Sequence, residues 1–101
     1  MKDIISKLNK IFDSRIRLGI MSVLMVNDHA DFNTLKDLLE ITDGNLASHL
    51  ASLEKNDLIG VSKQFVGRKP NTRYFATEKG KELFREHLEY LNKLINSQTH
   101  K

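Results

Sequence analysis

Apolar residues recur at helical spacing in the first quarter of the chain and predict two helices. Over residues 3–12 the apolar side chains lie three and four positions apart, which predicts an amphipathic helix. The next segment, 14–27, is apolar on nearly every side, and such a helix is normally the buried central helix of a small domain. Asp13 or Ser14 can cap its first turn with a side-chain oxygen, and the polar residues 27–31 end it.

Two shorter amphipathic patterns follow and predict a pair of packed helices. The first covers residues 34–40, with Asn33 as its N-cap. The second covers residues 45–56, and its leucines recur at i, i+4 and i+7, so this stripe can pack against the first helix. The joint between them, 41–44, is short, and Asp43 is expected to act as a cap there. Two short helices joined in this way form a helix-turn-helix when a third helix closes the core.

Beyond residue 57 the pattern becomes typical of β-strands. Residues 58–66 and 72–77 are rich in β-branched and aromatic side chains, and the segment between them, 67–71, is rich in turn formers. This pattern predicts a β-hairpin. Thr77 is then expected to cap a last amphipathic helix with its hydroxyl. The negative charge of Glu78 in the first turn interacts favourably with the dipole of the same helix. The predicted fold is mainly α with one hairpin.

Composition is that of a soluble globular protein. The 101 residues are 40% hydrophobic and 29% charged, and no apolar run is long enough to cross a membrane. The chain contains no cysteine, which excludes disulfides and thiolate metal sites, and its first residues lack the apolar core of a signal peptide. We therefore expect a single domain over residues 1–101 and a cytoplasmic location.

Positive charge is concentrated in the second half of the chain. Residues 1–57 carry 7 basic and 9 acidic side chains, whereas residues 58–101 carry 9 basic and 4 acidic ones. The segment 61–76, which spans most of the predicted hairpin, contains basic residues and no acid. An acid-free basic stretch attracts polyanions such as nucleic acids.

Five short strings of residues, in their order and spacing, carry a family resemblance that extends from about residue 14 to residue 80. They are Arg15-Ile16-Arg17-Leu18, Thr42–Leu50, Leu53–Ile59, Gly67–Tyr74 and Thr77-Glu78-Lys79-Gly80. Together they resemble the winged helix-turn-helix transcriptional regulators, in particular small MarR-like proteins. The resemblance implies a regulator that binds specific double-stranded DNA. As a homodimer, which the terminal helices described below favour, it would bind a pseudo-palindromic site. We expect a repressor with no enzymatic activity and no cofactor.

The polar face of the segment 44–56 is the predicted surface for the major groove. Opposite the leucines stand small or polar side chains without an acid, which suits contacts with base edges and phosphates. They are Asn45, Ser48, His49, Ser52 and Lys55. Gly44 has two interpretations: close approach of the DNA backbone to the helix N-terminus, or a turn glycine that ends the previous segment. For the whole set the alternative is an ordinary solvated helix face.

The predicted hairpin, with its basic segment 66–72, is the second surface expected to contact DNA. Arg68 and Lys69 can bind phosphate or enter a minor groove, and Lys63 and Arg73 flank them on the strands. Thr34 is expected to contact phosphate through its hydroxyl and backbone N–H. For the hairpin the alternative is a charged loop that only keeps the protein soluble.

The terminal helices, expected within residues 1–12 and 78–97, carry more apolar surface than a winged helix of this size can cover. A helix with such a stripe normally needs a partner helix, so we expect a symmetric homodimer built from both. The expected interface residues are Ile4, Ile5, Leu8, Ile11, Phe12, Phe84, Leu88, Leu91 and Ile95. The alternative is a monomer in which the two helices cover each other.

Other classes of function fit the sequence less well. A winged-helix module that binds protein instead of DNA would need an exposed apolar patch where this sequence has polar and basic residues. RNA binding would need more aromatic side chains for stacking. No arrangement typical of an active site is visible, and without two metal ligands at i, i+4 we expect no metal site.

Overall fold

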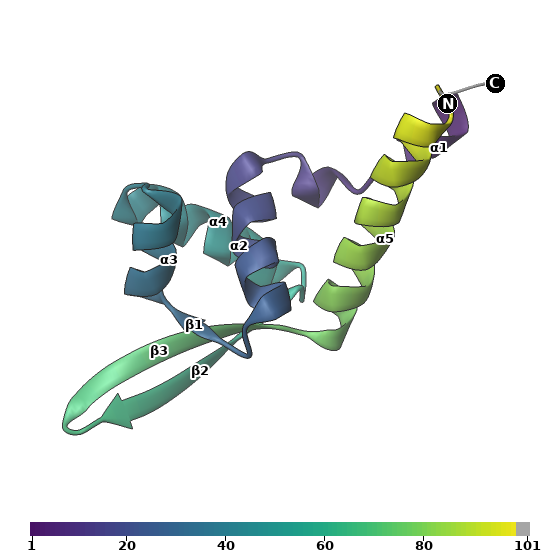
Figure 1. Cartoon of the computed structure of the whole chain (residues 1–101). Helices are drawn as coiled ribbons and strands as arrows, with labels where there is room; N and C mark the ends of the chain where they lie inside the picture. Colours follow the sequence, from purple (N-terminus) through teal and green to yellow (C-terminus); the bar gives the residue numbers. More distant parts are fainter. Residues whose placement is uncertain (99–101) are drawn as a thin grey trace.

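The computed structural model describes residues 1–98; residues 99–101, which the sequence analysis includes in the same domain, lie outside the described range. Helices make up most of this range, and the two long strands follow one another between the fourth and the last α-helix (Figure 1). The helices are α1 (Lys2–Lys7), the 3₁₀-helix η1 (Lys10–Phe12), α2 (Arg15–Val26), α3 (Phe32–Leu39), α4 (Asp43–Lys55) and α5 (Glu78–Asn96). The strands are β1 (Ala30–Asp31), β2 (Ile59–Val66) and β3 (Lys69–Ala76).

Helix α2 lies at the centre of the core, as its pattern predicts. Ile20, Met21 and Leu24 are buried in one cluster with Leu35 of α3 and with the leucine stripe of α4. Each such side chain contributes about 1.5–3 kcal/mol when it leaves water. The stripe of α4 is buried along its whole length, so this helix has only its opposite face to offer to a partner.

Side-chain caps define where the helices begin, and two of them differ from the prediction. Ser14 caps α2, as expected, by accepting the N–H of Arg17. Asp31, and not Asn33, caps α3, because Asp31 ends strand β1 in the extended conformation that an N-cap needs and accepts the N–H of Thr34 at 2.8 Å. Thr42, and not Asp43, caps α4 by accepting the N–H of Asn45.

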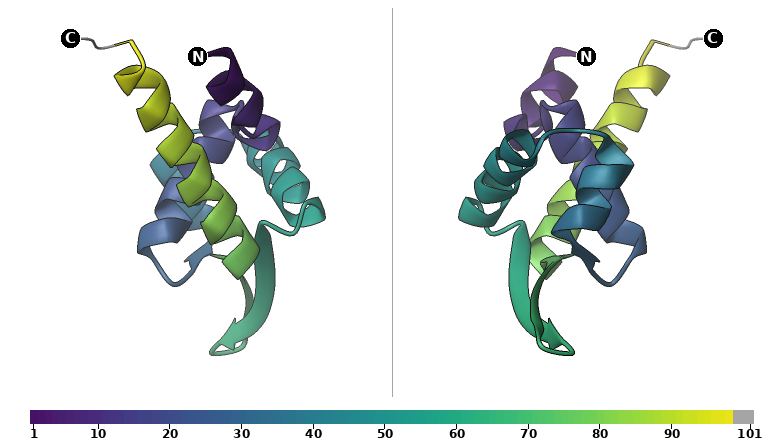
Figure 2. Two further views of the ribbon diagram at one scale, coloured as in Figure 1. Left: turned by 90° about the vertical axis from the view of Figure 1, so that its right-hand side faces the viewer. Right: turned by 90° about the vertical axis from the view of Figure 1, so that its left-hand side faces the viewer.

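The strands form a three-stranded antiparallel sheet in the order β1-β3-β2. The hairpin is confirmed, but its turn is shorter than predicted: Val66 pairs with Lys69, so only Gly67 and Arg68 connect the strands. Gly67 has a φ of +66°, which suits the first position of a two-residue hairpin turn. Strand β1 is an addition to the prediction, because two residues show no periodicity. In both views of Figure 2 the hairpin projects away from the helices.

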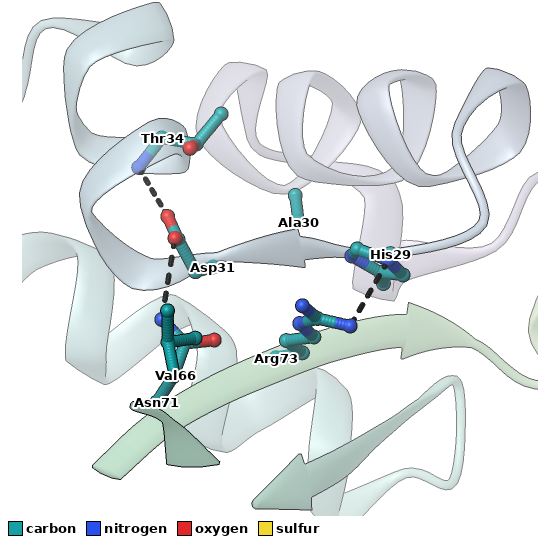
Figure 3. A pocket seen from close by; sticks show the side chains of 7 residues that line it. All are labelled: His29, Ala30, Asp31, Thr34, Val66, Asn71 and Arg73. Atoms are coloured by element: carbon teal, nitrogen blue, oxygen red, sulfur yellow. Dashed lines mark hydrogen bonds between the residues drawn. The ribbon is translucent and has the colours of Figure 1, made fainter. Parts of the chain in front are cut away.

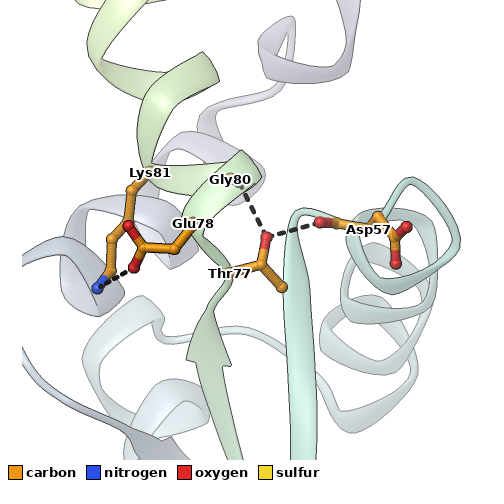
Figure 4. Close-up of polar contacts among 5 residues, drawn as sticks. All are labelled: Asp57, Thr77, Glu78, Gly80 and Lys81. Carbon is orange, nitrogen blue, oxygen red and sulfur yellow. Dashed lines mark hydrogen bonds and ion pairs between the residues drawn. The ribbon is translucent and has the colours of Figure 1, made fainter.

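Thr77 connects the end of the hairpin, the start of α5 and the loop after α4 (Figure 4). Its hydroxyl accepts the N–H of Gly80 at 2.9 Å, as the predicted cap, and donates to the carbonyl oxygen of Asp57 at 2.6 Å. Asp57 has a φ of 63° and turns the chain from α4 towards β2. This contact fixes the direction in which α5 leaves the core.

The N-terminal segment is two short helices instead of the single predicted one. Leu8 and Asn9 are extended and separate α1 from η1. Two expected interface residues, Phe12 and Phe84, lie in the core of the monomer at 1% and 4% exposure, with ring centroids 5.2 Å apart. The prediction that they lie outside the core is therefore wrong, since η1 folds back and inserts Phe12 between α2 and α5.

Candidate nucleic-acid interface

The outward face of α4 carries the polar residues singled out in the sequence. Asn45, Ser48 and Lys55 are exposed, whereas His49 and Ser52 are half-buried. The only acidic side chain in the first turn, Asp43, is paired with Lys36 of α3 at 2.8 Å. The exposed part of this face therefore offers amide, hydroxyl and ammonium groups, which bind base edges and phosphates.

His49 lies at the edge of this face and contacts the start of α2. Its Nδ1 is 3.1 Å from a terminal nitrogen of Arg17, and the Arg17 Nε donates to the carbonyl oxygen of Ile11. Partial burial and the neighbouring guanidinium both lower the pKa of His49 below its usual value. The imidazole is consequently neutral at pH 7, and its position is set by Arg17.

Gly44 is the second residue of α4 and lies inside the helix. This placement excludes the interpretation of a turn glycine that ends the previous segment. A Cβ at this position would meet no atom within 4 Å, so packing within the chain does not require glycine here. Approach of a DNA backbone to this helix N-terminus stays a prediction.

The tip of the hairpin carries the basic residues predicted for phosphate or minor-groove contact. Arg68 lies in the two-residue turn, Lys69 begins β3, and Lys63 lies on β2; all are exposed. Phe65 and Val66 near the tip are also exposed, at 75% and 59%. The tip thus combines cations with apolar side chains far from the core.

Arg73 in the middle of β3 and Thr34 in the first turn of α3 line the same pocket. Its volume is about 230 Å³, and its other lining residues include His29, Asp31, Asn71 and Val66, the residue before the hairpin turn (Figure 3). A terminal nitrogen of Arg73 is 3.4 Å from Nε2 of His29. Asp31 accepts from Thr34, and these hydrogen bonds lower the pKa of its carboxyl. The Thr34 N–H is therefore already engaged, contrary to the expectation that it is available for phosphate.

A comparison with protein families identifies the arrangement of helices and hairpin. A family model described as a winged helix DNA-binding domain matches residues 16–95. The chain belongs to this family. In winged-helix terms, α3 and α4 are the helix-turn-helix, α4 is the recognition helix and the β2–β3 hairpin is the wing. The predicted fold and the coarse prediction of a DNA-binding regulator are confirmed by this membership.

Two proteins are similar to this winged-helix chain in sequence, and a further solved structure shares its fold. An uncharacterized protein of Methanocaldococcus jannaschii is 34% identical over 79 residues, which are 78% of this chain and 86% of that protein. A transcriptional regulator homologue from Pyrococcus horikoshii OT3 is 31% identical, with a TM-score of 0.84 over 98% of this chain and 96% of that one. A MarR-family regulator structure from Enterococcus faecalis V583 shares the fold at 21% identity, with a TM-score of 0.72 over 88% and 82% of the two chains.

The terminal helices of the winged helix form an elongated extension beside the core. Helix α1 lies against the C-terminal half of α5 (Figure 1), where the ammonium groups of Lys7 and Lys93 lie 5.8 and 5.3 Å from the Tyr90 ring centre. Ile5 and Leu88 remain 52% and 45% exposed. The other expected interface residues are half-buried or, for Ile95, exposed; the half-buried ones are Ile4, Leu8, Ile11 and Leu91. Mutual cover of the two helices is therefore only partial.

Arg17 and Asp31 contribute to the site although no pattern in the sequence marks them for it. Arg17 contacts His49, 32 positions later, and Asp31 is within reach of Asn71, 40 positions later. No local pattern contains such contacts, which arise only when α2, α4 and the wing pack together.

Residues 1–98 lack two further kinds of feature. No helix in this range is long and apolar enough to cross a membrane. The same residues contain no cluster of three or more His, Cys, Asp or Glu side chains that could hold a metal ion.

Proposed function

We propose that the chain is a cytoplasmic transcriptional repressor whose residues 1–101 form one domain and which binds specific double-stranded DNA as a homodimer. The recognition segment 44–56 lies in the major groove, and the wing segment 66–72 lies on the backbone or in the minor groove. One observation carries this proposal: α4 buries its leucine stripe and turns an acid-free polar face outwards. Asparagine on such a face can pair with adenine, and serine can bond to bases or phosphates.

The homodimer is supported by the exposed apolar side chains on α1 and α5. Ile5 and Leu88 belong to the stripes of two helices that already lie together beside the core. A second copy of the same extension would cover these side chains from both sides. Two recognition helices about 34 Å apart would then contact successive major grooves of a pseudo-palindromic site. Repression requires only that the dimer occupies a site that the transcription machinery needs.

Selection of bound duplexes from a random library tests this function directly. We expect enrichment of a pseudo-palindrome with half-sites about one helical turn apart. Alanine at a base-contacting residue of the set Asn45, Ser48, His49 and Ser52 is expected to cost about 1–3 kcal/mol on the selected site and much less on random DNA.

A pair of serine variants provides the matched control. Ser48→Glu places a negative charge on the outward face of α4, whereas Ser22→Glu places the same charge on the exposed surface of α2, outside the α1–α5 extension. Only the first should abolish binding to the selected duplex, because a carboxylate there repels phosphate. Failure of the wild type to enrich any duplex would contradict the proposal and favour a winged-helix module that binds protein.

A further inference from the structure

Both the backbone and the side chain of Arg17 are fixed by hydrogen bonds near the start of α2. Its backbone N–H donates to the capping hydroxyl of Ser14 at 3.2 Å, and its Nε donates to the carbonyl oxygen of Ile11. The guanidinium is half-buried between η1 and α4, with a terminal nitrogen 3.1 Å from Nδ1 of His49. This side chain therefore meets the imidazole from a fixed direction.

The chemistry of the two groups allows only one arrangement of protons. A guanidinium has donors and no acceptor, and it keeps its charge at all ordinary pH values. Nδ1 of His49 must therefore accept, and a neutral imidazole that accepts at Nδ1 carries its single proton on Nε2.

The other ring nitrogen of His49 reaches the surface of the protein. No hydrogen bond links Nε2 to a partner in the described part of the chain, and within that part no buried side-chain nitrogen or oxygen lacks a partner. Nε2 has no hydrogen-bond partner among the described residues, so it cannot be one of the buried nitrogens, all of which have a partner. Nε2–H is thus a donor available on the surface of α4.

We propose that Arg17 is a positioning residue for DNA recognition: it holds His49 in the Nε2–H tautomer, so that the recognition helix offers one fixed donor to an acceptor on a base edge. This inference rests on the proposed function. In the major groove the acceptors are N7 of either purine, O6 of guanine and O4 of thymine, whereas cytosine offers an amino donor. The position opposite His49 should therefore exclude cytosine on the contacted strand.

The lowered pKa of His49 agrees with this geometry. Desolvation and the Arg17 charge both disfavour the imidazolium, and Arg17 is the charged side chain that faces the ring. A protonated ring would carry a second N–H at Nδ1, directed at the guanidinium. The neutral ring avoids this repulsion and keeps the donor at Nε2 unambiguous.

Nitrogen-15 NMR of the histidine rings in the free protein tests the tautomer without DNA. We expect the His49 signals of the wild type to show a protonated Nε2 and an unprotonated Nδ1. In Arg17→Met, which keeps the apolar stem but no donor, the two tautomers should mix and the His49 pKa should rise. Arg17→Lys, which retains a cationic donor, should restore the wild-type signature at least in part.

Two controls separate positioning from general damage to the fold. Arg15→Met removes an exposed guanidinium two positions away and should leave the His49 signals unchanged. Backbone amide spectra show whether Arg17→Met is folded, and Arg17→Lys provides the comparison if it is not. A wild-type ring protonated at Nδ1, or a signature that does not change in a folded Arg17→Met, would overturn the tautomer assignment.

Replacing purine N7 by a C–H group, one position at a time in a selected duplex, tests the contact with DNA. If His49 donates to N7, one such 7-deaza substitution should weaken wild-type binding by about tenfold, the loss of one hydrogen bond. The same 7-deaza substitution should hardly change the affinity of His49→Ala for the duplex. It should lower the affinity of Arg17→Met by less than it lowers that of the wild type. If the wild type, His49→Ala and Arg17→Met all lose the same affinity, His49 does not donate to that base, even where the NMR signals confirm its tautomer. Absence of any selected duplex would instead contradict the proposed function.

Discussion

Gly44 and Gly80 both lie in the first turn of a helix, yet their surroundings give them different roles. A Cβ on Gly80 would overlap the carbonyl oxygen of Leu58, so the close approach of α5 to the residue that precedes β2 requires glycine there. A Cβ on Gly44 would enter open space. Glycine weakens a helix, so a helical glycine without a packing reason points to an external partner.

Gly44→Ala is predicted to separate stability from DNA binding. The free energy of unfolding should rise by up to about 1 kcal/mol, because alanine has the higher helix propensity and meets no neighbour. Affinity for DNA should fall, since the added methyl group stands where a phosphate would approach the helix N-terminus. Urea unfolding and binding to a selected duplex measure the two effects.

Gly80→Ala is the matched control for this prediction. It should lower the free energy of unfolding by about 1–3 kcal/mol, as overpacking of a core does. If Gly44→Ala binds DNA as tightly as the wild type, the DNA backbone does not approach this part of α4.

A second prediction at the residue scale concerns His87, a buried side chain whose Nδ1 accepts the N–H of Asn9 at 3.3 Å. Burial lowers its pKa, and the charge of Asp13 opposes this shift only in part. With a folded pKa below the unfolded one, the unfolded chain binds more protons under acidic conditions. The stability that neutral His87 contributes is thus complete above about pH 6.5 and is lost as the pH falls through the folded pKa.

Urea unfolding at pH 7.5 and at pH 5.5 measures this loss. His87→Gln keeps an acceptor but does not titrate, so its stability should depend less on pH than that of the wild type. His49→Gln serves as the comparison, because the pKa of His49 is lowered as well. An equal pH dependence in the wild type and in His87→Gln would contradict the assignment to His87.

At the scale of elements, the sequence predicts the features that depend on neighbouring residues. It misses those that depend on contacts between residues far apart in the chain. The helix pattern, the cap Thr77 and the buried stripe of α4 depend on neighbours within a few residues, and all were predictable. Strand β1 exists because Ala30 pairs with Tyr74, and no pattern of two residues reveals such a partner. Phe12 continues the helical spacing of α1, but a break at Leu8 and contact with Phe84 place it in the core.

The candidate site follows the same division. The leucine spacing implies the polar face of α4, because the positions of the buried leucines determine which residues lie on the opposite side of the same helix. The role of Arg17 depends on how α2 crosses α4, and the engagement of Thr34 depends on a cap that the extended strand β1 provides. Both are consequences of packing.

The contribution of the wing to DNA binding can be measured from the salt dependence of the affinity. Arg68 and Lys69 lie in an exposed tip with no acid beside them in the sequence. Each neutralised phosphate contributes about 0.9 to the slope of log affinity against log salt. Replacing both by alanine removes four cations from a dimer, so the slope should become shallower by up to about 3.6.

The matched control removes two exposed cations outside the wing and outside the expected interface residues, Arg15 at the start of α2 and Lys79 in the first turn of α5. Their replacement by alanine should change the slope less. An unchanged slope after loss of Arg68 and Lys69 would mean that the wing tip stays in solvent when DNA is bound.

The whole molecule is elongated, with principal extents of 61 × 26 × 22 Å, and two projections leave its core. The wing extends from one side of the core and ends in a tip of exposed cations beside Phe65 and Val66, whereas the extension of α1 and α5 lies on another side and leaves apolar side chains of both helices exposed (Figure 1). A monomer gains nothing from keeping such side chains in water. A homodimer through the extension leaves both recognition helices and both wings free for DNA.

Loss of this dimer is the last prediction. Wild-type protein at micromolar concentration should scatter light as a particle of about 23 kDa, twice the 11.6 kDa of one chain. Leu88→Glu combined with Leu91→Glu should yield monomers, because burying carboxylates in an apolar interface is costly. DNA binding should weaken strongly, since two half-sites are no longer bound by one particle. Val26→Glu is the control: Val26 is 81% exposed at the end of α2, outside the extension, and its variant should stay dimeric. A wild type that remains monomeric would show that the partial cover of α5 by α1 within one chain is sufficient.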